Sequence, residues 1–292
     1  MRQTELFQQA KQLRQRNDAQ IFPLPKEQQT NLFEIKKILS IDSETKVAAF
    51  IYQPAYLPSQ GIVLNFRGSG FMHHWTPHDR AFARSLTFAT NYTVIDVDYP
   101  LAPEHPFPAA VNASFAVFKY VQTHYHDFSA TGTQLAVMGH SSGGNLAVIT
   151  QLLAKRNDLK LADKLLLDFP VLDLDTDAAQ KNYPAGQVIP VEESRLMNSF
   201  YLSDSTQQLT GNPLISPILA TKEELLEFPP TEIHTAEFDS LRDEAEQFAQ
   251  HLVSAYVHVN LCRYPKSYHG FTVVKTGAGA RSFNDFIQFI QQ

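Results

Sequence analysis

Several kinds of feature are missing from this 292-residue chain. It has one cysteine, Cys262, so no disulfide can form within it. Its net charge is −6, which argues against a surface for nucleic acid or for anionic lipid. No apolar run approaches the roughly 18 residues of a membrane span, and residues 1–19 lack the apolar core of a secretion signal. These absences predict a soluble, cytoplasmic protein without stable membrane association.

The chain does have the material for a large core, with 43% hydrophobic and 18% charged residues. Its length suits one large α/β domain or two small ones. From residue 61 onward, apolar runs alternate with helical patterns, which is typical of a parallel sheet covered by helices on both faces. The predicted strands are 32–41, 46–54, 61–66, 92–99, 134–140, 164–172, 231–238 and 259–265, of which the first two form an antiparallel pair. The predicted helices are 4–17, 80–89, 109–122, 145–156, 192–202, 245–256 and 281–291.

A G-x-S-x-G motif, Gly-His-Ser-Ser-Gly, occupies residues 139–143 between an apolar strand and a helical pattern. This context is typical of a nucleophile elbow, in which the serine sits on a sharp, strained turn and its hydroxyl projects above the sheet. Side chains at Gly139 and Gly143 would clash in that turn. The motif predicts Ser141 as the nucleophile, with the N-terminus of the next helix directed at the site. Ser142 lies one residue into the helix, and its useful group is the backbone N–H.

A serine nucleophile needs a general base, and the elbow predicts the chain order serine, acid, histidine. The histidines that follow Ser141 are His234, His251, His258 and His269. The first falls inside a predicted strand, and the next two lie in or just after a predicted helix. His269 instead follows the strand 259–265, at the sheet edge that carries the elbow, and Gly270 permits a tight turn beside it. We therefore predict His269 as the base.

The acid that orients this base should lie just after the preceding strand, 231–238. Asp239 is the first residue past that strand and is the predicted acid. Glu237 remains an alternative if the strand ends early, whereas Asp243 and Glu244 fit the first turn of a helix. The loop carboxylates after the strand 164–172 form a weaker alternative: Asp173, Asp175 and Asp177.

No cofactor and no metal are predicted. Gly68-Ser69-Gly70 could begin a dinucleotide-binding G-x-G-x-x-G, but the third glycine position holds His73. His73, His74 and His78 are close in sequence, yet only Asp79 accompanies them, so the pattern of a metal site is absent. We expect these histidines to be solvated or to pack beneath a cap.

The chain resembles the hormone-sensitive-lipase-like carboxylesterases of the α/β-hydrolase fold over roughly residues 60–290. The most specific match is DYPLAPEHPFPAA, and MGHSSGGNLA is similar to the family elbow. Later blocks follow in the family order: FPVLDLD, NPLISPI, FPPTEIHTAEFDSLRDEAEQFAQHL and RYPKSYHGF. The resemblance implies one α/β-hydrolase domain over 1–292, with a mostly parallel sheet of about eight strands, helices on both faces and a small helical cap from 1–30 and 175–210. It also implies a Ser141–Asp239–His269 triad and hydrolysis of short acyl esters.

The same resemblance gives a role to FRGSGF, residues 66–71. The family usually has His-Gly-Gly-Gly in this loop, and its backbone N–H groups form the oxyanion hole. By position, Arg67 replaces the histidine and Ser69 replaces the middle glycine. The expected donors are therefore the N–H groups of Gly68, Ser69 and Ser142. The added Cβ of Ser69 costs on the order of 1 kcal/mol if the loop requires a positive φ there.

Three side chains near this loop and the elbow are expected to contact substrate. Phe71 is an apolar candidate for a pocket under the cap. Arg67 has two interpretations: it pairs with a nearby carboxylate and braces the loop, or it faces the pocket and favours an anionic substrate. His140, where many relatives have aspartate, is expected to line the pocket.

The sequence thus predicts a serine carboxylesterase that hydrolyses small-molecule esters with short acyl chains. An acyltransferase or amidase on the same triad remains an alternative. A non-catalytic ligand-binding protein is another, as in the gibberellin receptors, which resemble this family but lack a working triad. Edge-strand dimers occur in the family, so the resemblance also allows a homodimer.

Overall fold

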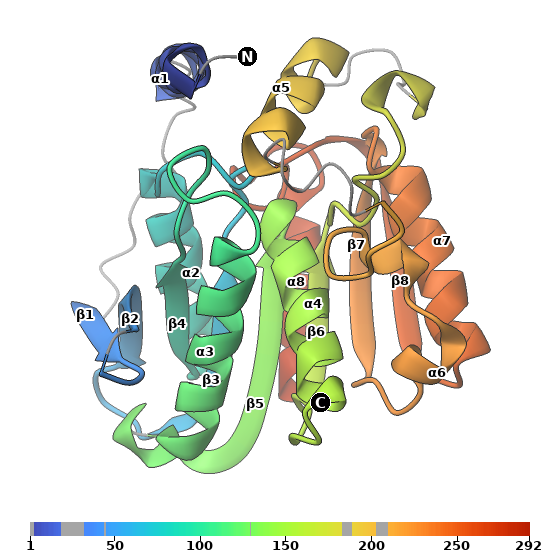
Figure 1. Cartoon of the computed structure of the whole chain (residues 1–292). Helices are drawn as coiled ribbons and strands as arrows, with labels where there is room; N and C mark the ends of the chain where they lie inside the picture. Colours follow the sequence, from blue (N-terminus) through green and yellow to red (C-terminus); the bar gives the residue numbers. More distant parts are fainter. Residues whose placement is uncertain (1–2, 19–31, 44, 129, 183–188, 203–209) are drawn as a thin grey trace.

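The structure, a computed structural model, describes all residues except 1–2, 19–31, 44, 129, 183–188 and 203–209. An eight-stranded sheet runs through the centre in the order β1-β2-β4-β3-β5-β6-β7-β8 (Figure 1). Its strands are β1 (Leu32–Ser40), β2 (Lys46–Pro54), β3 (Ser59–Phe66), β4 (Thr93–Asp98), β5 (Ala130–His140), β6 (Lys164–Asp168), β7 (Thr231–Phe238) and β8 (Val259–Tyr268). β2 is antiparallel to both β1 and β4, and all other neighbours are parallel. The predicted α/β class and the antiparallel first pair are confirmed.

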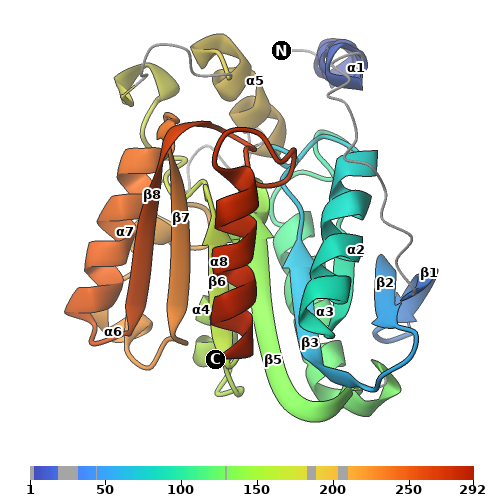
Figure 2. The ribbon, with the colours of Figure 1, turned by 180° about the vertical axis from the view of Figure 1, so that it is seen from behind.

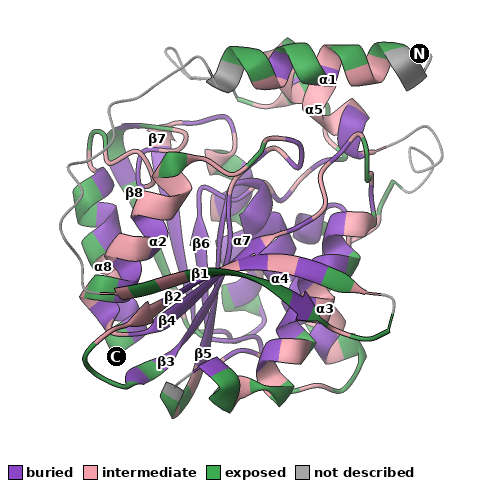
Figure 3. Cartoon of the chain, turned by 90° about the vertical axis from the view of Figure 1, so that its left-hand side faces the viewer, coloured by how far each residue is buried: buried purple, intermediate pink, exposed green. Residues whose placement is uncertain are grey.

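Helices cover both faces of the sheet, as Figures 1 and 2 show from opposite sides. One face carries α2 (Pro77–Thr90) and α8 (Gly279–Gln291), and the other carries α3 (Ala109–Thr123), α4 (Ser142–Arg156) and α7 (Arg242–Ser254). Successive strand residues alternate between these layers: Val63 packs with α2 and α8, whereas Ile62 and Leu64 pack with α3 and α4. Figure 3 shows the inner strands buried between the layers and the edge strand β1 partly exposed. Burial on both sides explains the continuous apolar runs in the sequence.

Strand β6 ends earlier than predicted, at Asp168 instead of residue 172. Phe169 adopts φ 38°, and Pro170 has no N–H to donate to a ladder, so the chain turns away. Strand β8 runs longer than predicted and ends at Tyr268, directly before His269. The carboxyl ends of β5, β6, β7 and β8 therefore meet at one edge of the sheet.

Two helices lie above this edge in Figure 1, α1 (Gln3–Asp18) and α5 (Val191–Tyr201). Arg14 on α1 donates to the carbonyls of Met72 and Ala102, both at 2.8 Å, and pairs with Glu104 at 2.7 Å. A second ion pair joins α1 to α5 through Arg16 and Glu193. These contacts hold α1 over the loops of the sheet edge.

The two helices fall within the predicted cap segments, 1–30 and 175–210. The parts of those segments at 1–2, 19–30, 183–188 and 203–209 lie outside the described residues. The short helices are η1 (Tyr125–Phe128), η2 (Ala178–Gln180), η3 (Pro217–Leu219) and α6 (Lys222–Leu225). No helix in the described part of the chain is long and apolar enough to cross a membrane.

Candidate active site

Ser141 stands on a sharp turn between β5 and α4. Its backbone has φ 52° and ψ −119°, a strained conformation for a residue with a side chain. A Cβ on Gly139 would lie 2.1 Å from the Gly143 carbonyl oxygen, and one on Gly143 would lie 1.9 Å from the Phe66 carbonyl oxygen. Only glycine fits at these two positions, which explains the spacing of the motif. The Ser141 N–H donates to the Asp168 carbonyl at 2.9 Å and ties the turn to β6.

The structure brings the three predicted triad residues together. His269 Nε2 lies 2.9 Å from Ser141 Oγ, and His269 Nδ1 lies 2.7 Å from Asp239 Oδ2. Asp239 follows β7 and His269 follows β8, so two adjacent parallel strands deliver both side chains to the elbow. Gly270, at φ 84°, makes the turn after the histidine. In this geometry the imidazole can accept the hydroxyl proton while the carboxylate holds Nδ1–H.

The surroundings of His269 favour its charged form. Burial opposes the imidazolium and alone would lower the pKa of His269. The charge and the hydrogen bond of Asp239 outweigh this, helped by the charges of Asp168 and Glu244, so the pKa is raised above its ordinary value. These surroundings therefore stabilise the imidazolium form of His269.

The other histidines considered as bases lie elsewhere. His234 is buried, with Nδ1 2.8 Å from Ser282 Oγ and Nε2 2.9 Å from Glu232 Oε1. His251 lies in α7, and His258 lies just before β8. Neither position is at the edge of the sheet that carries Ser141.

The alternative acids are engaged with other partners. Glu237 accepts from the Lys266 N–H at 2.7 Å, and Asp243 pairs with Arg242. The loop carboxylate Asp173 caps its own turn by accepting from two backbone N–H groups. Among the described residues, Asp239 is the one carboxylate that bonds His269.

The loop that follows β3 lies against the nucleophile. Its positive φ angles fall on Gly70 (53°) and Phe71 (60°), so the Cβ of Ser69 carries no such strain. The Ser69 N–H, expected to be an oxyanion donor, donates instead to Ser142 Oγ at 2.9 Å. Within the described parts of the chain, the N–H groups of Gly68, Gly70 and Ser142 have no acceptor. Two of these residues, Gly68 and Gly70, also border a cavity at Ser141.

Hydroxyl groups hold this loop in place. Ser69 Oγ lies 2.7 Å from Tyr99 OH, which donates to the Arg67 carbonyl at 2.8 Å. Ser69 Oγ also lies 3.4 Å from Ser142 Oγ. All of these side chains are buried. The serine that replaces the expected glycine therefore anchors the loop to β4 and to the elbow.

Arg67 is only 1% exposed and borders neither of the two cavities at the site. Its Nη1 donates to the His73 carbonyl at 2.7 Å, and its Nη2 lies 3.8 Å from Asp98 Oδ1. The guanidinium also lies over the Tyr99 ring, 5.1 Å from the centroid. This geometry fits the interpretation that Arg67 pairs with a carboxylate and braces the loop after β3. It does not fit the expected contact of Arg67 with substrate.

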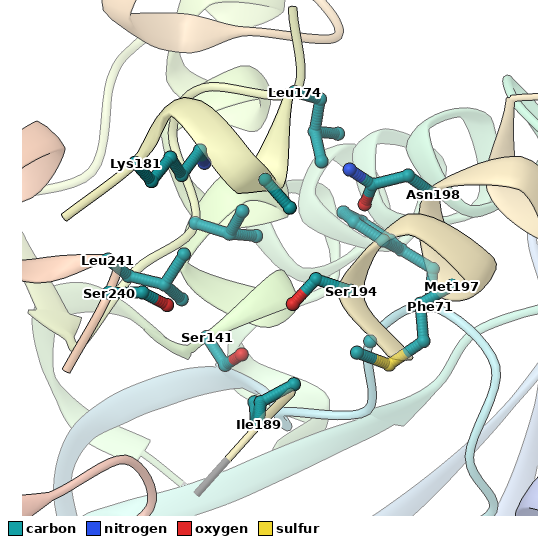
Figure 4. Close-up of a pocket in the computed structure, with 13 residues that line it drawn as sticks. Phe71, Ser141, Leu174, Lys181, Ile189, Ser194, Met197, Asn198, Ser240 and Leu241 are labelled. Carbon is teal, nitrogen blue, oxygen red and sulfur yellow. The ribbon is translucent and has the colours of Figure 1, made fainter. Parts of the chain in front are cut away.

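Two cavities meet at Ser141. The smaller, of about 50 Å³, is drawn in Figure 4. The side chains of its wall come from the oxyanion loop, the insertion after β6 and the start of α7: Phe71, Val171, Leu174, Ala178, Lys181, Ser194, Met197, Asn198 and Leu241. The larger, of about 640 Å³, is bordered by His269 and by His73, Trp75, His78, His140, Phe169, Val273 and Val274. Gly70, Ser141, Ile189 and Met197 border both cavities.

Phe71 and His140, both expected to contact substrate, lie on different cavities. The Phe71 ring stacks on Tyr201 with centroids 3.7 Å apart and forms a wall of the smaller cavity. His140 borders the larger cavity, and its Nδ1 lies 2.8 Å from Asp168 Oδ2.

The histidines weighed as metal ligands, His73, His74 and His78, all border the larger cavity. In the part of the chain that the structure describes, no three His, Cys, Asp or Glu side chains are grouped as a metal site. Their position fits packing and solvation around the entrance to the site.

Sequence reasoning missed the ion pair that closes the smaller cavity. Lys181 Nζ lies 2.5 Å from Glu244 Oε2 and donates to the Asp173 carbonyl at 2.6 Å. Glu244 was assigned to a first helical turn, where it does lie, but it is buried and accepts from the Leu172 N–H at 2.7 Å. Burial raises the pKa of Glu244 even though Lys181 opposes this. No local pattern signals a pair between residues this far apart in the chain.

Comparisons with known proteins show the family of this chain. A protein-family model described as alpha/beta hydrolase fold matches residues 63–273. An arylesterase of Saccharolobus solfataricus is 33% identical over 76% of this chain and 71% of its own length. The carboxylic ester hydrolase LipN of Mycobacterium tuberculosis is 31% identical over 84% of this chain and 67% of its own length.

Solved structures of esterases have the same architecture. An esterase of Pyrobaculum calidifontis superimposes with a TM-score of 0.82 at 25% identity, over 97% of this chain and 92% of that one. A thermostable esterase of Pseudomonas putida shares the fold, with a TM-score of 0.84 at 24% identity over 97% and 88% of the two chains. The resemblance to hormone-sensitive-lipase-like carboxylesterases found in the sequence is confirmed.

Proposed function

Because the chain belongs to the α/β-hydrolase family of carboxylic ester hydrolases, we propose that it is a serine carboxylesterase acting on short-chain acyl esters of small molecules. The observation that carries this proposal is the hydrogen-bonded series Ser141 Oγ, His269 Nε2, His269 Nδ1 and Asp239 Oδ2, with spacings of 2.9 and 2.7 Å. Ser141 is the nucleophile, His269 the general base and Asp239 the acid that orients it.

The reaction begins when Ser141 Oγ attacks the ester carbonyl carbon and its proton passes to His269 Nε2. The carbonyl oxygen becomes an oxyanion, which needs preorganised N–H donors. The free amides of Gly68, Gly70 and Ser142 are the candidates. Ser69, whose amide is occupied, supports these donors through its side chain. His269 then delivers the proton to the leaving alcohol, and water activated by His269 releases the acid.

The position of His269 indicates which part of the ester occupies each cavity. The leaving alcohol oxygen must receive its proton from His269 Nε2, so the alcohol lies on the side of this histidine. His269 borders the larger cavity but not the smaller. The alcohol part therefore occupies the larger cavity, and the acyl chain occupies the smaller one.

The size of the smaller cavity supports short acyl chains. A single water molecule needs about 10–15 Å³ of such a cavity. The smaller cavity, of about 50 Å³, therefore holds about three to five groups the size of a water molecule. Acetyl to butyryl chains fit within this limit. The ion pair of Lys181 and Glu244 and the ring of Phe71 block further extension.

Two alternative functions use the same scaffold. An acyltransferase or amidase would share the triad and would differ in which nucleophile or leaving group enters the larger cavity. Adding alcohols or amines to the assay and identifying the products would separate these activities from ester hydrolysis. A non-catalytic ligand-binding protein is less well supported, because the three triad side chains lie within hydrogen-bonding distance of one another.

The test is hydrolysis of nitrophenyl esters from acetate to decanoate by the wild type and by Ser141→Ala. We expect activity on the short members and its loss, by at least about a thousandfold, in the variant. Thermal melting of both proteins controls for folding. A wild type without activity at any chain length would favour the ligand-binding alternative, and an active Ser141→Ala protein would refute the assigned nucleophile.

A further inference from the structure

A second carboxylate, Asp168, lies buried behind the triad at the end of β6. Its Oδ2 lies 2.8 Å from His140 Nδ1, and its Oδ1 accepts from Thr272 Oγ1 at 3.0 Å. Its backbone carbonyl accepts from the Ser141 N–H at 2.9 Å. The mechanism proposed above makes no use of this side chain.

These contacts connect the two segments that carry the nucleophile and the base. His140 and Ser141 form the elbow, and Thr272 lies three residues after His269 in the same loop. The ring of Phe169, the residue after Asp168, also packs edge-on against His269 with centroids 4.8 Å apart. Asp168, the last residue of β6, therefore helps set the positions of both Ser141 and His269.

Hydrogen bonds engage both side-chain oxygens of Asp168, Oδ2 with His140 Nδ1 and Oδ1 with Thr272 Oγ1. The His140 ring lies between Phe82 and Phe169, and its Nε2 is buried without a partner. A proton on Nε2 would have no acceptor there, so the buried ring favours the tautomer that donates Nδ1–H to Asp168.

The other charged or titratable groups near this pair are accounted for. From Thr272 a buried series continues to Ser282 on α8 and to His234 and Glu232 on β7. Tyr264 on β8 connects His234 to Asp285 on α8. Around His269 itself lie Asp239 and Glu244, and Glu244 is paired with Lys181. None of these interactions places a fixed positive charge against Asp168.

We propose that Asp168 is a second positioning carboxylate of this active site, which aligns Ser141 with His269 and stabilises the His269 imidazolium by its charge. This inference rests on the proposed function, since it needs His269 to act as the base. The direction of the His269 pKa, to whose increase Asp168 contributes, agrees with it. His140 holds the carboxylate from the elbow side.

The experiment measures the rate at which an alkyl fluorophosphonate labels Ser141 as a function of pH. In this reaction Ser141 Oγ bonds to phosphorus, fluoride leaves, and the hydroxyl proton passes to His269. The labelling rate falls when His269 becomes protonated, and the midpoint of that fall does not depend on the fraction of folded protein. The proteins compared are the wild type, Asp168→Asn and Thr272→Val. The first variant removes the charge at constant shape, and the second keeps the charge but removes one hydrogen bond.

We expect the midpoint of Asp168→Asn to move to lower pH by roughly half a unit to one unit, because an anion near the imidazolium is lost. Its rate at high pH should also fall, because the alignment is weakened. Thr272→Val should keep the wild-type midpoint and lose about threefold or more of the rate at high pH. An unchanged or raised midpoint in Asp168→Asn, or an equal shift in Thr272→Val, would overturn the proposal. Absence of labelling in the wild type would instead count against the proposed function itself.

Discussion

The assignment of the acyl chain to the smaller cavity predicts how chain-length preference should change. Leu174 is buried and lines only that cavity. Leu174→Ala removes three carbon atoms from its wall, which makes room for up to about three more methylene groups. Each buried methylene is worth about 0.8 kcal/mol, or roughly a fourfold change in kcat/KM. Hexanoate is two methylenes longer than butyrate, the longest chain that fits the wild-type cavity, so the gain on hexanoate relative to acetate has an upper limit of about 15-fold.

The gain should be smaller than this limit if neighbouring side chains collapse into the space. We therefore expect the hexanoate-to-acetate ratio of kcat/KM to rise by about 4- to 15-fold. The ratio is measured with nitrophenyl esters of both acids, so that the leaving group stays constant.

Val274→Ala is the matched control, because Val274 lines only the larger cavity. It should alter the dependence on the alcohol and change the hexanoate-to-acetate ratio by less than about twofold. If Val274→Ala raises that ratio and Leu174→Ala does not, the two cavities have been assigned the wrong way round. If neither variant changes it, cavity volume does not limit the acyl chain.

Three further outcomes are expected. The pKa of His269 is raised, and the base must be neutral to accept a proton. We therefore expect kcat/KM, measured from pH 5 to 9, to fall as the pH drops through a midpoint above 6.5. A midpoint below 6.5 would contradict this. Ser142→Ala removes the acceptor that holds the Ser69 N–H, which loosens the loop and should lower kcat by about threefold or more; a rise would show that the freed Ser69 amide acts as an additional oxyanion donor. Lys181→Met leaves the buried Glu244 carboxylate unpaired and should lower the free energy of unfolding by about 3–5 kcal/mol in urea titrations. Adding Glu244→Gln should restore much of that loss, and no recovery would mean that the cost has another origin.

The sequence predicted the features that are local or follow a fixed order along the chain. The elbow motif and the rule that parallel strands end at one edge were sufficient to select Asp239 and His269, which the structure places in contact. The strand pattern failed at β6, because residues 169–172 remain apolar after the chain has turned at Phe169. An apolar run indicates that residues are buried, and residues beyond the last hydrogen-bonded residue of β6 are still buried.

Side-chain contacts between distant segments could not be predicted where no motif or chain-order rule applies. The bond from the Ser69 N–H to Ser142 Oγ depends on the side-chain rotamer of a residue 73 positions away. The resemblance identified the loop but not which of its amides would be occupied. Lys181 and Glu244 likewise gave no signal, since each taken alone looks like a solvated charge.

The two residues that depart from the family pattern, Arg67 and His140, each lie next to a carboxylate of the neighbouring strand. His140 lies directly opposite Asp168 in the parallel register of β5 and β6, and their side chains are hydrogen bonded. Arg67 follows β3, and its guanidinium lies 3.8 Å from Asp98 at the end of the neighbouring strand β4. In each case a carboxylate on the adjacent strand faces the buried side chain: Asp168 is hydrogen bonded to His140, and Asp98 forms an ion pair with Arg67, whose Nε and Nη2 make no hydrogen bond within the described residues. Strand register is not written in the local sequence, so each residue looked like a candidate for substrate contact when its partner was unknown. Arg67 donates to the His73 carbonyl and braces the loop after β3, whereas His140 holds a carboxylate that is also hydrogen bonded to Thr272 in the loop of His269.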